Sequence, residues 1–227
     1  MRPVRSVFQQ VSDIGLQSYL LRVYQYMGMG LALTGIVAYM LSSIPPRQLG
    51  SLPLFSVFGA LGISFFFHGR FQTLKASTAQ LLFWLYAGLI GGSLATLGSV
   101  YSMGSIVNAF FLTACTFGIM TVYGHTTQRD LTSVGSFCIM GVIGLFVAMV
   151  VNIFLRSPMI NFVTSLISVG VFTALIAYHT QSMRYMYYSL PQNQELRVKM
   201  SIAAALSLYV SVLNIFLSLL NLMGERK

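Results

Sequence analysis

Charge is scarce in this 227-residue chain, and negative charge is the scarcest: 4 Asp plus Glu stand beside 13 Lys plus Arg. Charged residues make up 7% of the chain, whereas soluble domains carry about 25%. So few charges cannot cover a water-facing surface, which argues against a soluble enzyme. A disordered chain is also disfavoured, because 56% of the residues are hydrophobic and disorder needs low hydrophobicity. The composition indicates a membrane protein.

Chemical motifs are scarce as well. The two cysteines, Cys115 and Cys138, lie in apolar runs and form no CxxC pair, metal-ligand spacing or disulfide framework. The motifs GxSxG, HExxH, GxxxxGK[ST] and GxGxxG do not occur. The basic residues stand singly between apolar runs and make no stripe for a phosphate backbone. We therefore expect no enzyme activity, no cofactor, no bound metal and no nucleic-acid partner.

Long uncharged runs are what the sequence has in place of charge. Seven of them approach the roughly twenty residues that cross a bilayer as a helix. Backbone groups in hydrocarbon must pair within a helix or a closed barrel, and no alternating barrel pattern is visible. The sequence predicts an all-α polytopic membrane protein, a seven-helix bundle embedded in the lipid bilayer; because the second run is short, six spans are the alternative. The runs are residues 23–44, 52–67, 81–101, 106–123, 134–155, 159–178 and 200–223.

The orientation follows from the positive charges between these runs. Nine Lys and Arg lie on the side of the N-terminus and four on the other side, which predicts a cytoplasmic N-terminus and an external C-terminus. Tyrosines on the same side as the N-terminus, before the first run and after the sixth, are expected to anchor the helices in the headgroup region. The nine are Arg2, Arg5, Arg22, Arg70, Lys75, Arg129, Arg184, Arg197 and Lys199; the four are Arg47, Arg156, Arg226 and Lys227; the tyrosines are Tyr19, Tyr24, Tyr26, Tyr185, Tyr187 and Tyr188.

Polar residues inside the runs have mainly structural interpretations. Glycines in the third and fifth runs, among them the Gly88 and Gly92 GxxxG pair, predict close helix packing. Asn108, Asn152 and Asn214 are predicted to hydrogen-bond between helices, because an amide in lipid must find a partner. None of the seven runs contains Asp or Glu, so the carboxylates that mark proton relays and cation sites in many transporters are missing.

Three segments have a recognisable pattern: Tyr123-Gly124-His125-Thr126-Thr127-Gln128-Arg129-Asp130-Leu131, Asn152-Ile153-Phe154-Leu155 and Asn214-Ile215-Phe216-Leu217-Ser218-Leu219-Leu220. They are similar to segments of the Bax-inhibitor family of small polytopic membrane proteins, in its bacterial branch. The first segment resembles the connection between that family's fourth and fifth helices, and the other two resemble the ends of its fifth and last helices. The resemblance runs from about residue 23 to residue 224.

The resemblance implies a bundle whose central last helix is wrapped by the others, and a pH-sensitive calcium leak through its core. Family gating is attributed to two aspartates that share a proton across the sixth and last helices. Two neighbouring carboxylates in a low dielectric cannot both ionise cheaply, so one of their pKa values rises. At these pore and pH-sensor positions the present chain has His179 and Ser211, which cannot offer two negative charges to a divalent cation.

Two functions therefore stay open. The first is a calcium or cation leak with altered or absent pH sensing, in which Thr127, Arg129 and Asp130 form the family's motif loop. The second is a non-conducting regulator that binds a membrane protease or another membrane partner. For both functions the expected location is the bacterial inner membrane. Arg129 and Asp130 have two interpretations: an ion pair that fixes the loop, or groups that close the inner mouth of a pore. The expected organisation is a cytoplasmic tail at 1–22, a seven-helix Bax-inhibitor-like membrane domain at 23–224 and a C-terminal tail at 225–227.

Overall fold

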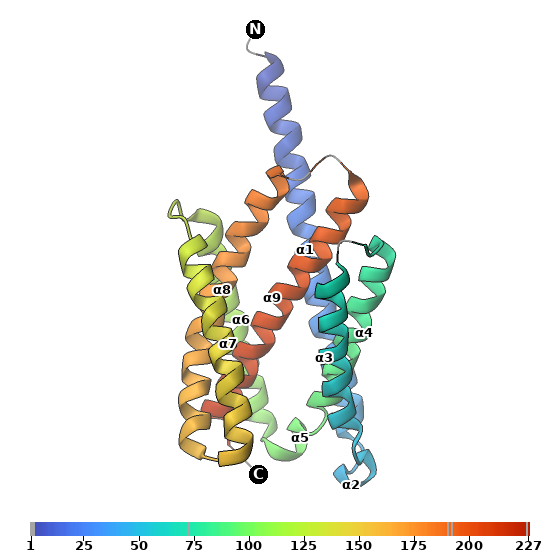
Figure 1. Cartoon of the computed structure of the whole chain (residues 1–227), viewed down its shortest axis with the longest axis vertical. Coiled ribbons are helices and arrows are strands. Elements are labelled where there is room, and N and C mark those ends of the chain that lie inside the picture. The colour runs from blue at the N-terminus through green and yellow to red at the C-terminus, as the bar shows by residue number, and fades with distance from the viewer. Residues whose placement is uncertain (1–2, 72, 190, 192, 226) are drawn as a thin grey trace. The chain divides into compact units, whose positions relative to one another are not determined.

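The computed structural model describes residues 3–71, 73–189, 191, 193–225 and 227, with the backbone alone for residues 3–14, 46, 47 and 68. Over those residues the chain forms nine α-helices and no strand, which confirms the all-α prediction (Figure 1). Seven helices are long, and α2 and α5 are single turns. Arg2 and Arg226, which enter the orientation count, lie outside the described residues. The helices are α1 (Pro3–Ser42), α2 (Pro46–Leu49), α3 (Leu52–Arg70), α4 (Ala76–Leu94), α5 (Leu97–Val100), α6 (Met103–Thr126), α7 (Thr132–Leu155), α8 (Pro158–Ser189) and α9 (Gln194–Met223).

The long helices coincide with the seven predicted runs. Five segments in the described part of the chain are long and apolar enough to cross a membrane: Ala76–Val100, which joins α4 and α5, and the helices α6, α7, α8 and α9. The apolar part of α3, Leu52–Phe67, is shorter, and α1 is not among the five. The chain is thus a polytopic helical membrane protein, and its first and second spans rest on the sequence prediction.

The surface of the helices is apolar. Large side chains such as Phe65, Phe137 and Phe154 are 78%, 70% and 82% exposed. A soluble monomer rarely exposes large contiguous apolar patches, but lipid tails solvate such side chains well. The exposed faces therefore fit a surrounding bilayer. Helix α9 differs, because 56% of its most apolar stretch is buried against 11–28% in the other four segments. The most apolar stretch of α9 is thus the most buried of the five.

The chain divides into two compact units, of which the first comprises Met1–Thr96 and Met183–Leu206. In this unit α4 packs on α1 and on α3. Two glycines of α4 permit the contacts: a Cβ added to Gly91 would lie 2.8 Å from the Thr34 carbonyl oxygen, and one added to Gly92 would lie 2.7 Å from Ser56 Oγ. The Thr34 hydroxyl also donates a 2.9 Å hydrogen bond to the Ala87 carbonyl. Of the predicted GxxxG pair only Gly92 packs closely, since the space at Gly88 is open.

The second unit comprises Leu97–Ser182 and Ser207–Lys227. Here α6 and α7 each approach α8 closely at a glycine. A Cβ on Gly124 of α6 would lie 2.6 Å from the Ala177 carbonyl oxygen, and one on Gly135 of α7 would strike the Tyr178 ring. Small residues at these positions let the helix backbones come together. The predicted role of Gly135 in close packing is confirmed.

The third predicted run, residues 81–101, is not one continuous helix. Helix α4 starts at Ala76 and ends at Leu94, and the four-residue helix α5 follows at Leu97. The Ala95 N–H bonds the Gly92 carbonyl at 3.4 Å, three residues back, so the last turn tightens. Glycine has a low helix propensity, and two of them precede this break.

Helices extend beyond the apolar runs at the predicted cytoplasmic side. Helix α1 begins at Pro3, so the described part of the segment called a tail is helical and continues into the first run. Helix α8 continues past the sixth run to Ser189, and α9 starts at Gln194, before the seventh run.

The turn from α7 to α8 at the opposite ends of these helices contains an unusual backbone conformation. Arg156, the C-cap of α7, has φ 50° and ψ 32°, in the left-handed region that favours glycine. The Asn152 side chain stabilises this turn, because its Oδ1 accepts a 2.9 Å hydrogen bond from the Ser157 N–H. Pro158 then begins α8.

Candidate functional site

The loop between α6 and α7 carries the family motif, and a glutamine of α8 holds it in place. The Gln181 side chain donates from Nε2 to the Arg129 carbonyl at 2.8 Å and accepts at Oε1 from the Leu131 N–H at 2.9 Å. Gln181 is 5% exposed. One amide thus satisfies a backbone acceptor and a backbone donor of the loop, and it fixes the loop relative to α8 within the second unit.

The side chains of the motif act locally. Thr127 is the C-cap of α6, and its N–H donates to the Tyr123 carbonyl at 2.8 Å. The Asp130 carboxylate accepts from the Thr132 hydroxyl at 2.6 Å and from the Thr132 N–H at 2.9 Å, at the start of α7. These two hydrogen bonds lower the pKa of Asp130 below its ordinary value. A carboxylate at a helix N-terminus is also favoured by the helix dipole.

Of the two interpretations of Arg129 and Asp130, the ion pair is replaced by these contacts. In the described part of the chain Asp130 bonds Thr132 and forms no ion pair with Arg129. The reason is geometric: an acidic side chain beside a helix start reaches the free N–H groups of the first turn before it reaches a neighbouring side chain. Gln181, not the charge pair, sets the loop geometry.

The structure does not join His179 and Ser211 by a hydrogen bond. Ser211 is 2% exposed, and its hydroxyl donates to the Ser207 carbonyl at 3.0 Å on its own helix. His179 is half-buried on α8, and its ring lies 5.4 Å from the Tyr178 ring, centroid to centroid. Within the described residues the imidazole has no hydrogen-bond partner. The two positions therefore carry no shared proton.

The three asparagines predicted to bridge helices behave differently. Asn152 bonds the adjacent turn, as described above, and Asn214 Nδ2 donates to the Val210 carbonyl at 2.8 Å within α9. Asn108 is exposed on α6, and over the described residues its amide forms no hydrogen bond. A backbone N–H satisfies Asn152 and a backbone carbonyl satisfies Asn214, so neither amide needs a second helix as a partner.

A different set of amides does bridge two helices. Asn161 Nδ2 of α8 donates to Asn221 Oδ1 of α9 at 3.2 Å, and Asn221 Nδ2 donates to Ser165 Oγ at 2.8 Å. The Ser165 hydroxyl in turn donates to the Asn161 carbonyl at 2.8 Å. Sequence reasoning missed this network; the available signal was the spacing of Asn161 and Ser165, which are four residues apart on one helix face.

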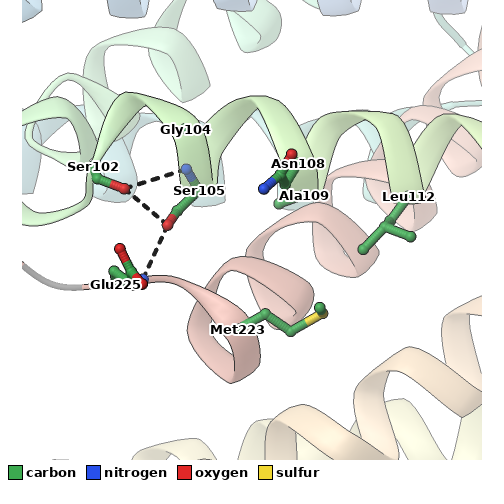
Figure 2. Close-up of a pocket in the computed structure, with 8 residues that line it drawn as sticks. All are labelled: Ser102, Gly104, Ser105, Asn108, Ala109, Leu112, Met223 and Glu225. Atoms are coloured by element: carbon green, nitrogen blue, oxygen red, sulfur yellow. Dashed lines mark hydrogen bonds between the residues drawn. The ribbon is translucent and has the colours of Figure 1, made fainter.

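A small cavity of about 220 Å³ lies where α6 begins and α9 ends (Figure 2). Ser102 is the N-cap of α6: its Oγ accepts from the Ser105 N–H at 3.3 Å. The Ser105 hydroxyl accepts the Glu225 N–H at 3.0 Å, and the Ser102 N–H donates to the Glu225 carbonyl at 3.1 Å. The segment after α9 is thus docked on the start of α6. The cavity is lined by Ser102, Gly104, Ser105, Asn108, Ala109, Leu112, Met223 and Glu225.

Chemically, these sites offer hydroxyls, amides and backbone carbonyls. No group of three or more His, Cys, Asp or Glu that could hold a metal occurs among the described residues. The four carboxylates belong to Asp13, Asp130, Glu195 and Glu225, all outside the predicted runs. A divalent cation prefers carboxylate oxygens, and the buried polar groups of the second unit supply neutral oxygens instead.

The sequence model of the family described as "Inhibitor of apoptosis-promoting Bax1" matches residues 16–227. An uncharacterized protein of Rickettsia prowazekii is 44% identical over 222 residues, which is 95% of this chain and 92% of that protein. The inner membrane protein YbhL of Escherichia coli K12 is 35% identical over 223 residues, 94% of each chain. A protein of Caulobacter vibrioides is 38% identical over 231 residues, 95% of this chain and 91% of that protein.

The chain therefore belongs to the Bax-inhibitor family and is an integral membrane protein. The resemblance predicted from the motif loop is confirmed. The family match begins at residue 16, within α1, and so includes residues that the sequence reading assigned to the tail.

Proposed function

We propose that this protein is a cation leak of the bacterial inner membrane that works without the acid-pair sensor of its family. The inner-membrane location is supported by the similarity to the inner membrane protein YbhL. The leak is supported by membership of the family and by the last helix, since 56% of its most apolar stretch is buried. The proposal includes no catalytic step.

The contacts of Ser211 and His179 support the absence of the acid-pair sensor. The Ser211 hydroxyl is engaged by the Ser207 carbonyl, and the His179 ring has no hydrogen-bond partner among the residues described. A proton-sharing latch needs two groups that compete for one proton, and serine does not titrate in the physiological range. The pair therefore has no shared proton that acid could change between pH 6 and 8. We expect a weak leak that acid does not increase.

The test is calcium flux from liposomes that contain the purified protein, measured between pH 6 and 8. The native chain is compared with the double variant His179→Asp/Ser211→Asp, and each single variant serves as a matched control that supplies one carboxylate without a partner. We expect a steep increase in flux at acid pH only in the double variant. A steep acid response of the native chain contradicts the proposal.

A second function, a non-conducting regulator that binds a membrane protease or another membrane protein, is favoured by the lack of carboxylates in the predicted runs. It predicts no flux from the native chain at any pH, and capture of a partner by the full chain that fails when residues 1–20 are removed. Flux from the native protein in the liposome assay decides for the leak.

A further inference from the structure

Five buried side-chain polar atoms of the described residues have no hydrogen-bond partner: Tyr19 OH, Thr121 Oγ1, Thr173 Oγ1, Thr180 Oγ1 and Arg197 Nε. Buried polar groups are nearly always paired, so each unpaired one calls for an explanation such as an absent ligand. The phenol of Tyr19 and the guanidinium of Arg197 are the two strongest donors in this set. Both lie in the first unit, and both contact one aromatic ring.

That ring belongs to Tyr187. The Tyr19 ring lies 5.5 Å from it, centroid to centroid, with an interplanar angle of 43°. The Arg197 Cζ lies 4.7 Å from the centre of the Tyr187 ring, and Arg197 Nη1 donates to the Tyr187 hydroxyl at 3.4 Å. Gly15 of α1 leaves room for this hydroxyl, because a Cβ there would strike it. Helices α1, α8 and α9 each provide one side chain to this cluster of Tyr19, Tyr187 and Arg197.

The cluster carries a positive charge that the described residues do not neutralise. The cation–π contact with Tyr187 orients the guanidinium but leaves its charge in place. With the described residues Arg197 forms no ion pair, and it lies in the first turn of α9, where the helix dipole adds positive potential. Glu195 is exposed and is not paired with it. Arg197 is half-buried and its Nε is enclosed, so an anion would supply the acceptor that this atom lacks among the described residues.

The Tyr19 phenol is the second unpaired hydrogen-bond donor of this cluster. It is 6% exposed, in contrast to Tyr185 and Tyr188, which are 63% and 57% exposed as headgroup anchors would be. Burial raises the pKa of Tyr19 to about 12, so the phenol keeps its proton and can only donate to an anion. The anchoring role predicted for Tyr19 and Tyr187 is therefore not what the structure gives them.

We propose that Tyr19 and Arg197, oriented by Tyr187, bind a phosphate oxyanion. Arginine's planar fork matches phosphate oxygens, and a phenol O–H provides a third donor. All three residues flank the predicted runs on the predicted cytoplasmic side, at the level of the lipid headgroups. The phosphate of an anionic phospholipid is the ligand available at that depth. The site is independent of any ion leak.

The test measures thermal unfolding of the full chain in a neutral detergent, followed by the fluorescence of its single tryptophan, Trp84. One arm titrates phosphatidylglycerol against phosphatidylcholine, and a second arm titrates sodium phosphate against sodium chloride at equal ionic strength. We expect phosphatidylglycerol to raise the unfolding temperature and phosphatidylcholine to have little effect. Arg197→Lys keeps the charge and loses the fork, and we expect about tenfold weaker binding, which corresponds to about 1.4 kcal/mol.

Tyr19→Phe keeps the ring and removes the donor, so several-fold weaker binding is expected. Matched controls are Arg70→Lys and Tyr185→Phe, which change exposed residues on the same predicted side and are expected to bind as the native chain does. A response to inorganic phosphate alone that needs Tyr19 and Arg197 supports the oxyanion site and identifies a soluble ligand. No response to either phosphate source, or equal responses in the native chain, Arg197→Lys and Tyr19→Phe, overturns it.

Discussion

At the scale of single residues, Gln181 illustrates how one side chain organises a segment far from it in sequence. Its amide meets the backbone of the loop at Arg129 and Leu131, some fifty residues earlier in the chain. Because both partners are backbone groups, the identities of the loop side chains do not reveal the contact. The loop's shape depends on a residue outside the motif by which the family is recognised.

Replacing Gln181 by leucine removes both hydrogen bonds and keeps most of the side-chain volume. We expect the free energy of unfolding to fall by roughly 1–3 kcal/mol, because a buried backbone donor and acceptor lose their partner. Amide hydrogen exchange at Leu131 measures the local effect and is expected to become faster. Gln128→Ala, at an exposed position in the same loop, is the control and is expected to change neither quantity. Unchanged exchange at Leu131 in Gln181→Leu contradicts the assignment.

Asp130 gives a pH-dependent prediction. Hydrogen bonds from Thr132 lower its pKa, so its contribution to stability is present above the ordinary carboxyl pKa and is lost as the pH falls through the lowered value. Thr132→Val removes the hydroxyl donor, and the titration midpoint of Asp130 is expected to rise toward the ordinary value of about 3.9. The chain has only two aspartates, Asp13 and Asp130, so ¹³C-aspartate NMR resolves the titration. The control is Thr126→Val, whose hydroxyl bonds Val122; an equal shift in both variants contradicts the assignment.

At the scale of helices, the sequence indicated their number and type but not their full extent. Apolar runs between charges and prolines mark where lipid begins and ends, and each long helix coincides with one such run. A helix does not have to stop where the lipid stops, so the extensions of α1, α8 and α9 left no signal in hydropathy. The break after Leu94 arises from backbone preference and tertiary packing. It lies within an apolar run, so hydropathy does not reveal it.

Candidate residues were predicted less well than helices, for a related reason. The sequence identified polar residues within the runs but could not assign their partners, because a partner depends on helix rotation. Asn152 and Asn214 found local carbonyls and N–H groups, while Asn161 and Asn221, which the sequence did not single out, face each other across two helices. The positions of His179 and Ser211 came from resemblance, and their lack of a mutual bond required coordinates.

The packing of α4 on α1 gives a paired prediction. A methyl group at Gly91 would collide with the Thr34 carbonyl and with Val37, whereas one at Gly88 would meet open space. We expect Gly91→Ala to lower the free energy of unfolding by about 1–3 kcal/mol through overpacking. Gly88→Ala is expected to leave stability unchanged or to raise it by up to about 1 kcal/mol, because alanine favours the helix. Thermal unfolding measures both, and equal losses in the two variants argue against this packing.

At the scale of the whole molecule, the number of membrane crossings, seven or six, decides on which side of the membrane the C-terminus lies. Nine positive charges against four predict a cytoplasmic N-terminus, and seven crossings then place the C-terminus outside. If α3 stays in one leaflet, the count is six and the C-terminus returns to the cytoplasm.

Reporter fusions distinguish these two numbers. With a flexible spacer after Lys227, we expect alkaline phosphatase to be active and green fluorescent protein to be dark, because the first folds outside the cytoplasm and the second inside. Fluorescent protein fused before Met1 is the control and is expected to be bright. A bright N-terminal fusion combined with a bright C-terminal fusion shows an even number of crossings, which contradicts seven spans and agrees with the alternative of six.

Arg156 has two separate properties: a strained left-handed backbone conformation, and a positive charge that enters the orientation count. Glycine would relieve the roughly 1 kcal/mol by which such a φ disfavours other residues, and it would also remove one of the four basic residues on the predicted external side. Asparagine tolerates the same conformation and is neutral as well. Variants selected for thermostability at this turn are therefore expected also to strengthen the charge asymmetry, from nine against four to nine against three, which favours the same predicted orientation.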